Sequence, residues 1–139
     1  MTSAPNTLAK AIRMTTEEDR CLRRAMKLLR QPLSQITQAA VVDAAYKLGF
    51  CAAVKVPPHP YRGVWPDAPE RREETTSTRT TANFDPWSAQ LLTRAAAYVD
   101  VGETTFVLGA TFRYLADLKR VDGEHGPLAK LVLPAKYGT

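Results

Sequence analysis

Residues 10–48, KAIRMTTEEDRCLRRAMKLLRQPLSQITQAAVVDAAYKL, decide the fold, because their layout recurs at residues 79–118, RTTANFDPWSAQLLTRAAAYVDVGETTFVLGATFRYLADL. Each stretch has the pattern of a short alternating segment, an amphipathic helix, a turn and a second apolar helix. Laid over each other without a gap, the stretches share identical residues 70 positions apart. These pairs are Leu22 and Leu92, Arg24 and Arg94, Ala25 and Ala95, Ala40 and Ala110, and Leu48 and Leu118. The shared layout, more than the few identities, predicts an internal repeat.

The composition is that of an ordinary globular protein. The 139 residues suffice for one compact domain, and 45% of them are hydrophobic and 24% charged. No apolar run approaches the ~20 residues of a membrane span. The opening MTSAPNTLAK has no apolar core of a signal peptide, so we expect a cytoplasmic protein.

The cysteines and the net charge narrow the chemistry. Cys21 and Cys51 form no CxxC pair and have no histidine at ligand spacing, so we expect no disulfide framework, metal site or cofactor. Cys21 fits a small core residue. The net charge of +5 suits a polyanionic partner. Residues 1–50 hold eight basic and four acidic groups and so carry most of this excess.

The first repeat is predicted at residues 8–50, after a disordered lead-in at residues 1–7. Alternation from Leu8 places Ile12 and Met14 on one side of a strand. Thr15 or Thr16 then starts a helix, Pro32 breaks it, Ser34 is placed to cap the next helix and Gly49 ends that helix.

The rest of the chain divides into three segments. Residues 51–74 are rich in proline and predict a linker, with Tyr61 and Trp65 as candidates to dock on the core. Residues 75–120 predict the second repeat, in which Asp85 and Pro86 form a specific helix start and Thr104 or Thr105 caps the last helix. Residues 121–139 predict a C-terminal tail with an apolar piece.

A single strand followed by two helices has neither a strand partner nor a closed core, and two copies supply both. In this layout the chain resembles the ribbon-helix-helix family, which includes Arc and MetJ. The resemblance implies a mostly α fold with a two-stranded antiparallel ribbon. It implies an intramolecular pseudo-dimer of two ribbon-helix-helix units, with residues 8–120 forming one compact domain. It extends to single-chain tandem members such as TraY-type conjugation proteins and a T-DNA-processing accessory protein.

The family reads double-stranded DNA by inserting the ribbon into the major groove, so the outward strand residues are the candidate base readers. With Ile12, Met14, Ala82 and Phe84 inward, alternation turns the polar residues Arg13, Arg79, Thr81 and Asn83 outward. Arginine pairs with guanine, asparagine with adenine, and threonine bonds to a base or touches the thymine methyl group. The first strand also turns Ala9 and Ala11 outward, so the halves differ and predict a non-palindromic site.

Phosphate contacts are expected at the starts of the second helix of each repeat, where free backbone N–H groups favour an anion. The candidates at these starts are Ser34, Thr104 and Thr105, and Lys10 of the first strand is a further candidate for a phosphate contact. Capping alone would also explain the three hydroxyl residues. The basic residues of the first helix are either a source of nonspecific phosphate attraction or a solvated face.

Three interpretations of function remain open. The first is a DNA-binding transcriptional regulator or an accessory factor of plasmid or T-DNA transfer. Its partner in transfer would be a relaxase or another transfer protein. The protein would be a monomer that either binds DNA singly or pairs on DNA. The second is an antitoxin-type repressor whose C-terminal segment binds a toxin; TTFVLGATF is similar to the second helix of that group. The third is a helical interaction protein that does not bind DNA. An enzyme is not expected, because His59 and His125 have no orienting neighbours in sequence and no phosphate loop occurs.

Overall fold

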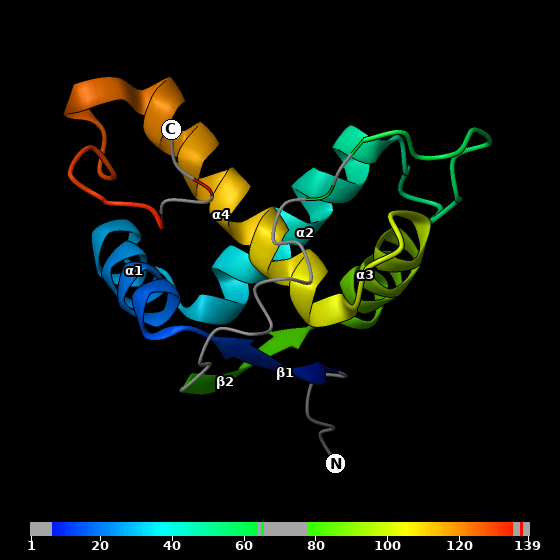
Figure 1. Cartoon of the computed structure of the whole chain (residues 1–139), viewed down its shortest axis with the longest axis horizontal. Coiled ribbons are helices and arrows are strands. Elements are labelled where there is room, and N and C mark those ends of the chain that lie inside the picture. The colour runs from blue at the N-terminus through cyan, green and yellow to red at the C-terminus, as the bar shows by residue number, and fades with distance from the viewer. Residues whose placement is uncertain (1–6, 64, 66–77, 135–136, 138–139) are drawn as a thin grey trace, which may run out of the picture.

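The computed structural model describes residues 7–63, 65, 78–134 and 137. A strand followed by two helices occurs twice along the chain (Figure 1). Parts of four predicted segments lie outside the described residues: residues 1–6 of the lead-in, residues 64 and 66–74 of the linker, residues 75–77 of the second repeat, and residues 135–136 and 138–139 of the tail. The elements are β1 (Leu8–Met14), α1 (Thr16–Leu29), α2 (Leu33–Leu48), β2 (Thr78–Phe84), α3 (Pro86–Tyr98), α4 (Glu103–Asp122) and the 3-10 turn η2 (Gly123–His125).

The two strands pair as the antiparallel ribbon that the resemblance implies. Leu8 lies opposite Phe84 and Met14 opposite Thr78. The inner face of the ribbon is buried, with Ile12, Met14, Ala82 and Phe84 at most 2% exposed. Leu8 shares the parity of Ile12 but is 49% exposed at the strand end. Four buried side chains therefore fix the register, since a slip by one residue would turn them to solvent.

The first helix of each half begins where the sequence predicts. Thr15 precedes α1 and accepts a hydrogen bond from the backbone N–H of Glu18, whose carboxylate accepts from the N–H of Thr15 in return. Asp85 precedes α3 and accepts from the N–H of Ser88, with Pro86 at the first helical position. A cap of this kind contributes about 1 kcal/mol, so both strand-to-helix junctions are locally fixed.

All four helices lie on one side of the ribbon, with α2 and α4 crossing at the centre and α1 and α3 on the flanks (Figure 1). Small residues at the centre, Ala40 and Ala45 on α2 and Ala110 on α4, are at most 1% exposed. Phe106 and Phe112 on α4 are fully buried. Each such aromatic side chain contributes about 1.5–3 kcal/mol through burial, so the central helices form the support on which the ribbon rests.

The segment after α2 docks on the helices rather than only spanning them. Trp65 is 5% exposed, and its ring stacks on Phe106 with centroids 4.4 Å apart. Its indole N–H donates to the carbonyl of Thr105 at 3.3 Å. The rings of Tyr61 and Tyr98 lie 5.9 Å apart. The predicted docking of Tyr61 and Trp65 is therefore confirmed.

The second half ends later than predicted, because α4 continues to Asp122 and takes the first two residues of the predicted tail. The apolar piece of the tail then folds back. Leu128 and Leu131 are fully buried, and the ammonium group of Lys119 donates to the carbonyl of Leu131 at 2.7 Å. Tyr137 stacks on Phe112 with centroids 4.6 Å apart. This segment closes the core beside α4.

Candidate nucleic-acid interface

The ribbon turns six side chains away from the helices, and we call this set the outer face. All of them are exposed, so the predicted outward orientation is confirmed. The cross-strand pairs are Ala9 with Asn83, Ala11 with Thr81, and Arg13 with Arg79. Because the opposite side of the same strands is buried, the outer face is held at a fixed angle to the helices and carries polar groups mainly from β2.

Arg13 and Arg79 face each other directly across the ribbon. Within the described part of the chain, neither guanidinium group makes a hydrogen bond or an ion pair. Like charges directly opposite one another destabilise a strand pair. An anion or an electronegative base edge would relieve that repulsion, so this end of the outer face is suited to such a partner.

Ser34 and Thr104 do not cap their helices, and the predicted caps at these residues, and at Thr105 as the alternative, are wrong. The capping positions are Pro32 and Gly102, and neither supplies a side-chain hydrogen bond. The extended residue that precedes α2 is Pro32, and the one that precedes α4 is Gly102. Both helices therefore begin earlier than the hydroxyl residues suggest. The hydroxyls consequently fall inside the first turn.

Both hydroxyl side chains bind the ribbon instead. The hydroxyl oxygen of Ser34 accepts from the backbone N–H of Asn83 at 2.9 Å. The hydroxyl group of Thr104 donates to the carbonyl of Ala11 at 3.2 Å. These bonds join the first turn of α2 to β2 and that of α4 to β1, so the helix starts lie beside the outer face. Thr105 is 4% exposed, and its side chain does not reach the surface where a phosphate would lie.

Lys10 forms an ion pair with Glu103. Its ammonium group lies 2.9 Å from the carboxylate of Glu103 at the start of α4, and the hydroxyl of Thr93 donates to the same carboxylate at 2.8 Å. Burial raises the pKa of Glu103, but the bonds from Lys10 and Thr93 outweigh it and leave that pKa below its usual range. Glu103 is therefore ionised at neutral pH, and it offsets the charge that Lys10 would offer to a phosphate.

Sequence reasoning missed Glu103 and Gln38. The side-chain oxygen of Gln38 accepts from the backbone N–H of Asp85 at 3.1 Å, directly after β2. Glu103 stands in the first turn of a helix, where an acidic residue ordinarily signals only a favourable position in the helix dipole. Its pairing with Lys10 joins residues 93 positions apart and left no local signal in the sequence.

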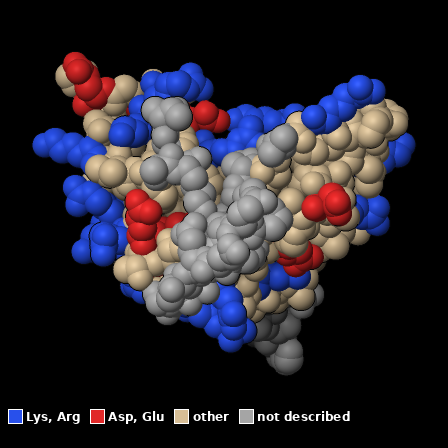
Figure 2. Space-filling view, in the orientation of Figure 1, with Lys and Arg blue, Asp and Glu red and all other residues tan. Residues whose placement is uncertain are grey.

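The helices on the two flanks of the ribbon differ in their number of basic side chains. Several basic side chains lie along the flank formed by α1 (Figure 2). Those of α1 and its C-terminal cap, all exposed, are Arg20, Arg23, Arg24, Lys27 and Arg30. Of these, Arg23 pairs with Asp19 on the same helix. On the opposite flank, α3 has one basic residue, Arg94. The first turn of α1 also holds Glu17, Glu18 and Asp19, so α1 with its cap carries a net charge of +2 against +1 for α3, and the positive surface at α1 lies in its later turns.

No group of three or more metal-ligating side chains occurs among the described residues. Within the same part of the chain, no helix has the length and apolar character that a membrane span requires. Cys21 is 5% exposed, and burial raises the pKa of its thiol to about 11, so it is unreactive at neutral pH. The core assignment of Cys21 is confirmed.

Comparison of the chain with protein-family models, with curated proteins and with solved structures finds no match.

Proposed function

We propose that this chain is a sequence-specific double-stranded DNA-binding protein that reads the major groove with the outer face of its ribbon. The observation that carries the proposal is the outer face itself, on which Arg13, Arg79, Thr81 and Asn83 are exposed on strands anchored from behind. The major groove, about 12 Å wide, admits a two-stranded ribbon. These side chains are the types that bond to base edges there.

The proposal includes an intramolecular pseudo-dimer of two ribbon-helix-helix units. Each element of the first half begins 70 positions before its counterpart: β1 and β2 at residues 8 and 78, α1 and α3 at 16 and 86, and α2 and α4 at 33 and 103. The strand register is centred on Ala11 and Thr81, which are also 70 positions apart. A two-fold axis through that pair would generate the whole ladder, as in an isologous dimer.

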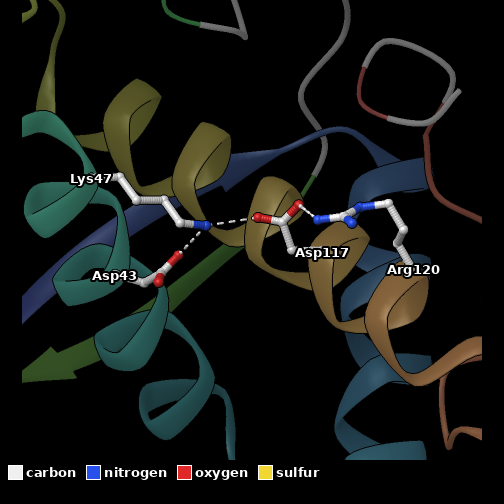
Figure 3. A network of polar contacts seen from close by, with 4 residues as sticks. All are labelled: Asp43, Lys47, Asp117 and Arg120. Carbon is white, nitrogen blue, oxygen red and sulfur yellow. Dashed lines mark hydrogen bonds and ion pairs between the residues drawn. The ribbon is translucent and has the colours of Figure 1, made fainter.

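A charge pair at the crossing of α2 and α4 favours pairing between the two halves of one chain. The ammonium group of Lys47 lies 2.8 Å from the carboxylate of Asp117, and these residues occupy equivalent positions in the halves. Asp43 and Arg120 extend the cluster (Figure 3). A homodimer would place two identical residues at this crossing. A single chain can place opposite charges there, which favours the intramolecular pairing over exchange between molecules.

The two edges of the outer face imply an asymmetric DNA site. β1 contributes two alanines and Arg13, whereas β2 contributes Arg79, Thr81 and Asn83. A symmetric dimer must read both half-sites alike, but this chain need not. We expect a site in which specific bases concentrate on the β2 side, with an arginine-to-guanine contact near the Arg13 and Arg79 pair.

The process served is proposed to be control of transcription or accessory work in plasmid or T-DNA transfer, in the cytoplasm, without catalysis by the chain itself. The antitoxin alternative is less well supported. Its toxin-binding segment would be the C-terminal tail, whose Leu128 and Leu131 are already fully buried against this chain. A partner would have to displace both of these side chains before it could use them.

The test is selection of bound duplexes from a randomised double-stranded pool, followed by titration of the recovered sequence against variants. The triple variant Arg79→Ala, Thr81→Ala, Asn83→Ala should lose sequence preference and retain weak, salt-sensitive binding. Each good base contact is worth about 1–3 kcal/mol of discrimination, so the loss should be at least tenfold. The control is Lys130→Ala, which removes the same charge from an exposed position in the C-terminal segment.

Three outcomes are informative. Loss of preference in the triple variant, with the control unchanged, supports the ribbon as the reading element. Unchanged selectivity of a folded triple variant would refute it. Failure of the wild-type protein to select any sequence above its nonspecific binding would favour the helical interaction protein.

A further inference from the structure

The two turns that lead into α2 and α4 have the same backbone geometry. Arg30 and Asp100 both adopt the left-handed conformation, with φ of 56° and 60°. The extended residues before the helices, Pro32 and Gly102, have φ and ψ of −71° and 158°, and of −69° and 160°. Each turn brings the start of its helix to the ribbon through the hydroxyl bonds described above. Matching geometry would let both turns approach DNA in the same manner.

The charges of the two turns are opposite. Residues 27–34 contain Lys27 and Arg30 and no acidic residue, for a charge of +2. The equivalent residues 97–104 contain Asp100 and Glu103 and no basic residue, for a charge of −2. The difference of four charges lies at equivalent places on the two sides of the ribbon, and the ion pair of Lys10 with Glu103 reduces it to three. A DNA backbone that approached both sides equally would be attracted at one and repelled at the other.

The carboxylate of Glu103 in the acidic α3–α4 turn is held in a fixed position. The two bonds to Glu103, from Lys10 on β1 and Thr93 on α3, fix its carboxylate between the ribbon and the flanking helix. Asp100 is exposed, and within the described residues it makes no ion pair that would offset its charge. A phosphate on this side would therefore meet the uncompensated carboxylate of Asp100, and the ion pair with Glu103 leaves Lys10 no free charge to attract that phosphate.

We propose that Asp100 and Glu103 are orientation-determining residues that keep the DNA backbone away from the α3–α4 turn, so that the protein binds its site in one direction with a footprint displaced toward α1 and α2. This proposal deepens the proposed function and rests on it. The repulsive element is what separates the two orientations, because the backbone geometry alone would accept either. The exposed basic residues in the later turns of α1, Arg23, Arg24 and Lys27, extend the attractive side beyond the turn.

The experiment compares charge-neutralising pairs on the duplex recovered by selection. Asp100→Asn with Glu103→Gln removes the two carboxylates of the turn, and asparagine tolerates the left-handed conformation at position 100. The matched control, Asp122→Asn with Glu124→Gln, removes two exposed carboxylates at the far end of α4 and in η2. Binding is measured over a range of salt concentrations, and hydroxyl-radical footprints are recorded on both strands.

Wild-type protein should give a footprint displaced to one side of the selected site. In the turn variant the footprint should extend on the short side, and the slope of log affinity against log salt should steepen by about 0.9 for each additional phosphate that the protein neutralises. Arg30→Asn, on the opposite turn, should make the slope shallower by about one. The far-end control should leave the slope and the footprint unchanged.

Equal effects of the turn variant and the far-end control would overturn the proposal, since net charge alone would then explain them. A footprint centred on the site in the wild-type protein would also overturn it while leaving the proposed function standing. Asp100→Asn alone retains the Lys10 and Glu103 pair, so it gives a second measurement if the double variant is less stable. Absence of any selective binding by the wild-type protein would overturn both proposals together.

Discussion

Replacement of Trp65 by alanine should destabilise the protein by about 3–5 kcal/mol, the range for removal of a buried tryptophan. Trp65 is 5% exposed, stacks on Phe106 at 4.4 Å and donates to the carbonyl of Thr105. The guanidinium carbon of Arg113 lies 5.2 Å from the centre of its ring. The free energy of unfolding of a domain is typically about 5–15 kcal/mol, so Trp65 alone would account for a large share of the stability of this protein.

A graded series separates the contributions. Trp65→Phe keeps a ring over Phe106 but removes the indole N–H, so the carbonyl of Thr105 loses that donor. We expect a loss of about 1–3 kcal/mol, smaller than for alanine. Trp87→Ala is the matched control, because Trp87 is only partly buried and donates to the exposed segment at Ala52. Its loss should be clearly smaller than that of Trp65→Ala.

The assay is urea unfolding followed by circular dichroism at 222 nm, which does not depend on the tryptophan that is removed. An unchanged dependence of free energy on urea would show that the variants unfold to comparable states. If Trp65→Ala cost less than about 1 kcal/mol, or no more than Trp87→Ala, the segment after α2 would be a simple tether. That result would refute the stacking and burial as a source of stability.

Two further predictions concern ionisable groups. A double-mutant cycle on Lys47→Ala and Asp117→Ala should give a coupling of about 0.2–1 kcal/mol at pH 7, because both side chains are more than a third exposed and solvent screens them. The hydrogen bond from Lys47 lowers the pKa of Asp117, so this stability is present above about pH 4 and is lost as the pH falls through the lowered pKa; a coupling that did not weaken as the pH was lowered below 4 would contradict the ion pair. A thiol reagent at pH 8 should modify Cys51 rapidly and Cys21 only after unfolding, and equal rates in the native protein would contradict the burial of Cys21.

Local chemistry made much of the fold predictable. Thr15 and Asp85 were recognisable as helix starts because a cap needs only a side-chain oxygen and the next few residues. The alternation around Ile12 and Ala82 was sufficient to decide which side of each strand faces the core, because neighbouring side chains of a strand point to opposite faces. The outer face follows directly from the same period.

Features that depend on distant parts of the chain were not predictable in detail. Ser34 and Thr104 have the chemistry of caps, but their hydroxyls bond to strands 49 and 93 positions away. The residues next to Glu103 in the sequence do not indicate its pairing with Lys10. The end of α4 at Asp122 also lies beyond the predicted boundary. In each case the local sequence is compatible with several conformations or partners, and a tertiary contact, or the packing around it, determines which one occurs.

The most direct test of the central claim is methylation interference on the selected duplex. Dimethyl sulfate methylates guanine N7 in the major groove and adenine N3 in the minor groove, and binding then selects the tolerated molecules. If the outer face enters the major groove, guanine N7 methylation within the site should block binding, most strongly at the guanine read by Arg13 or Arg79. Interference confined to adenine N3, or none at either position, would contradict major-groove reading by this ribbon.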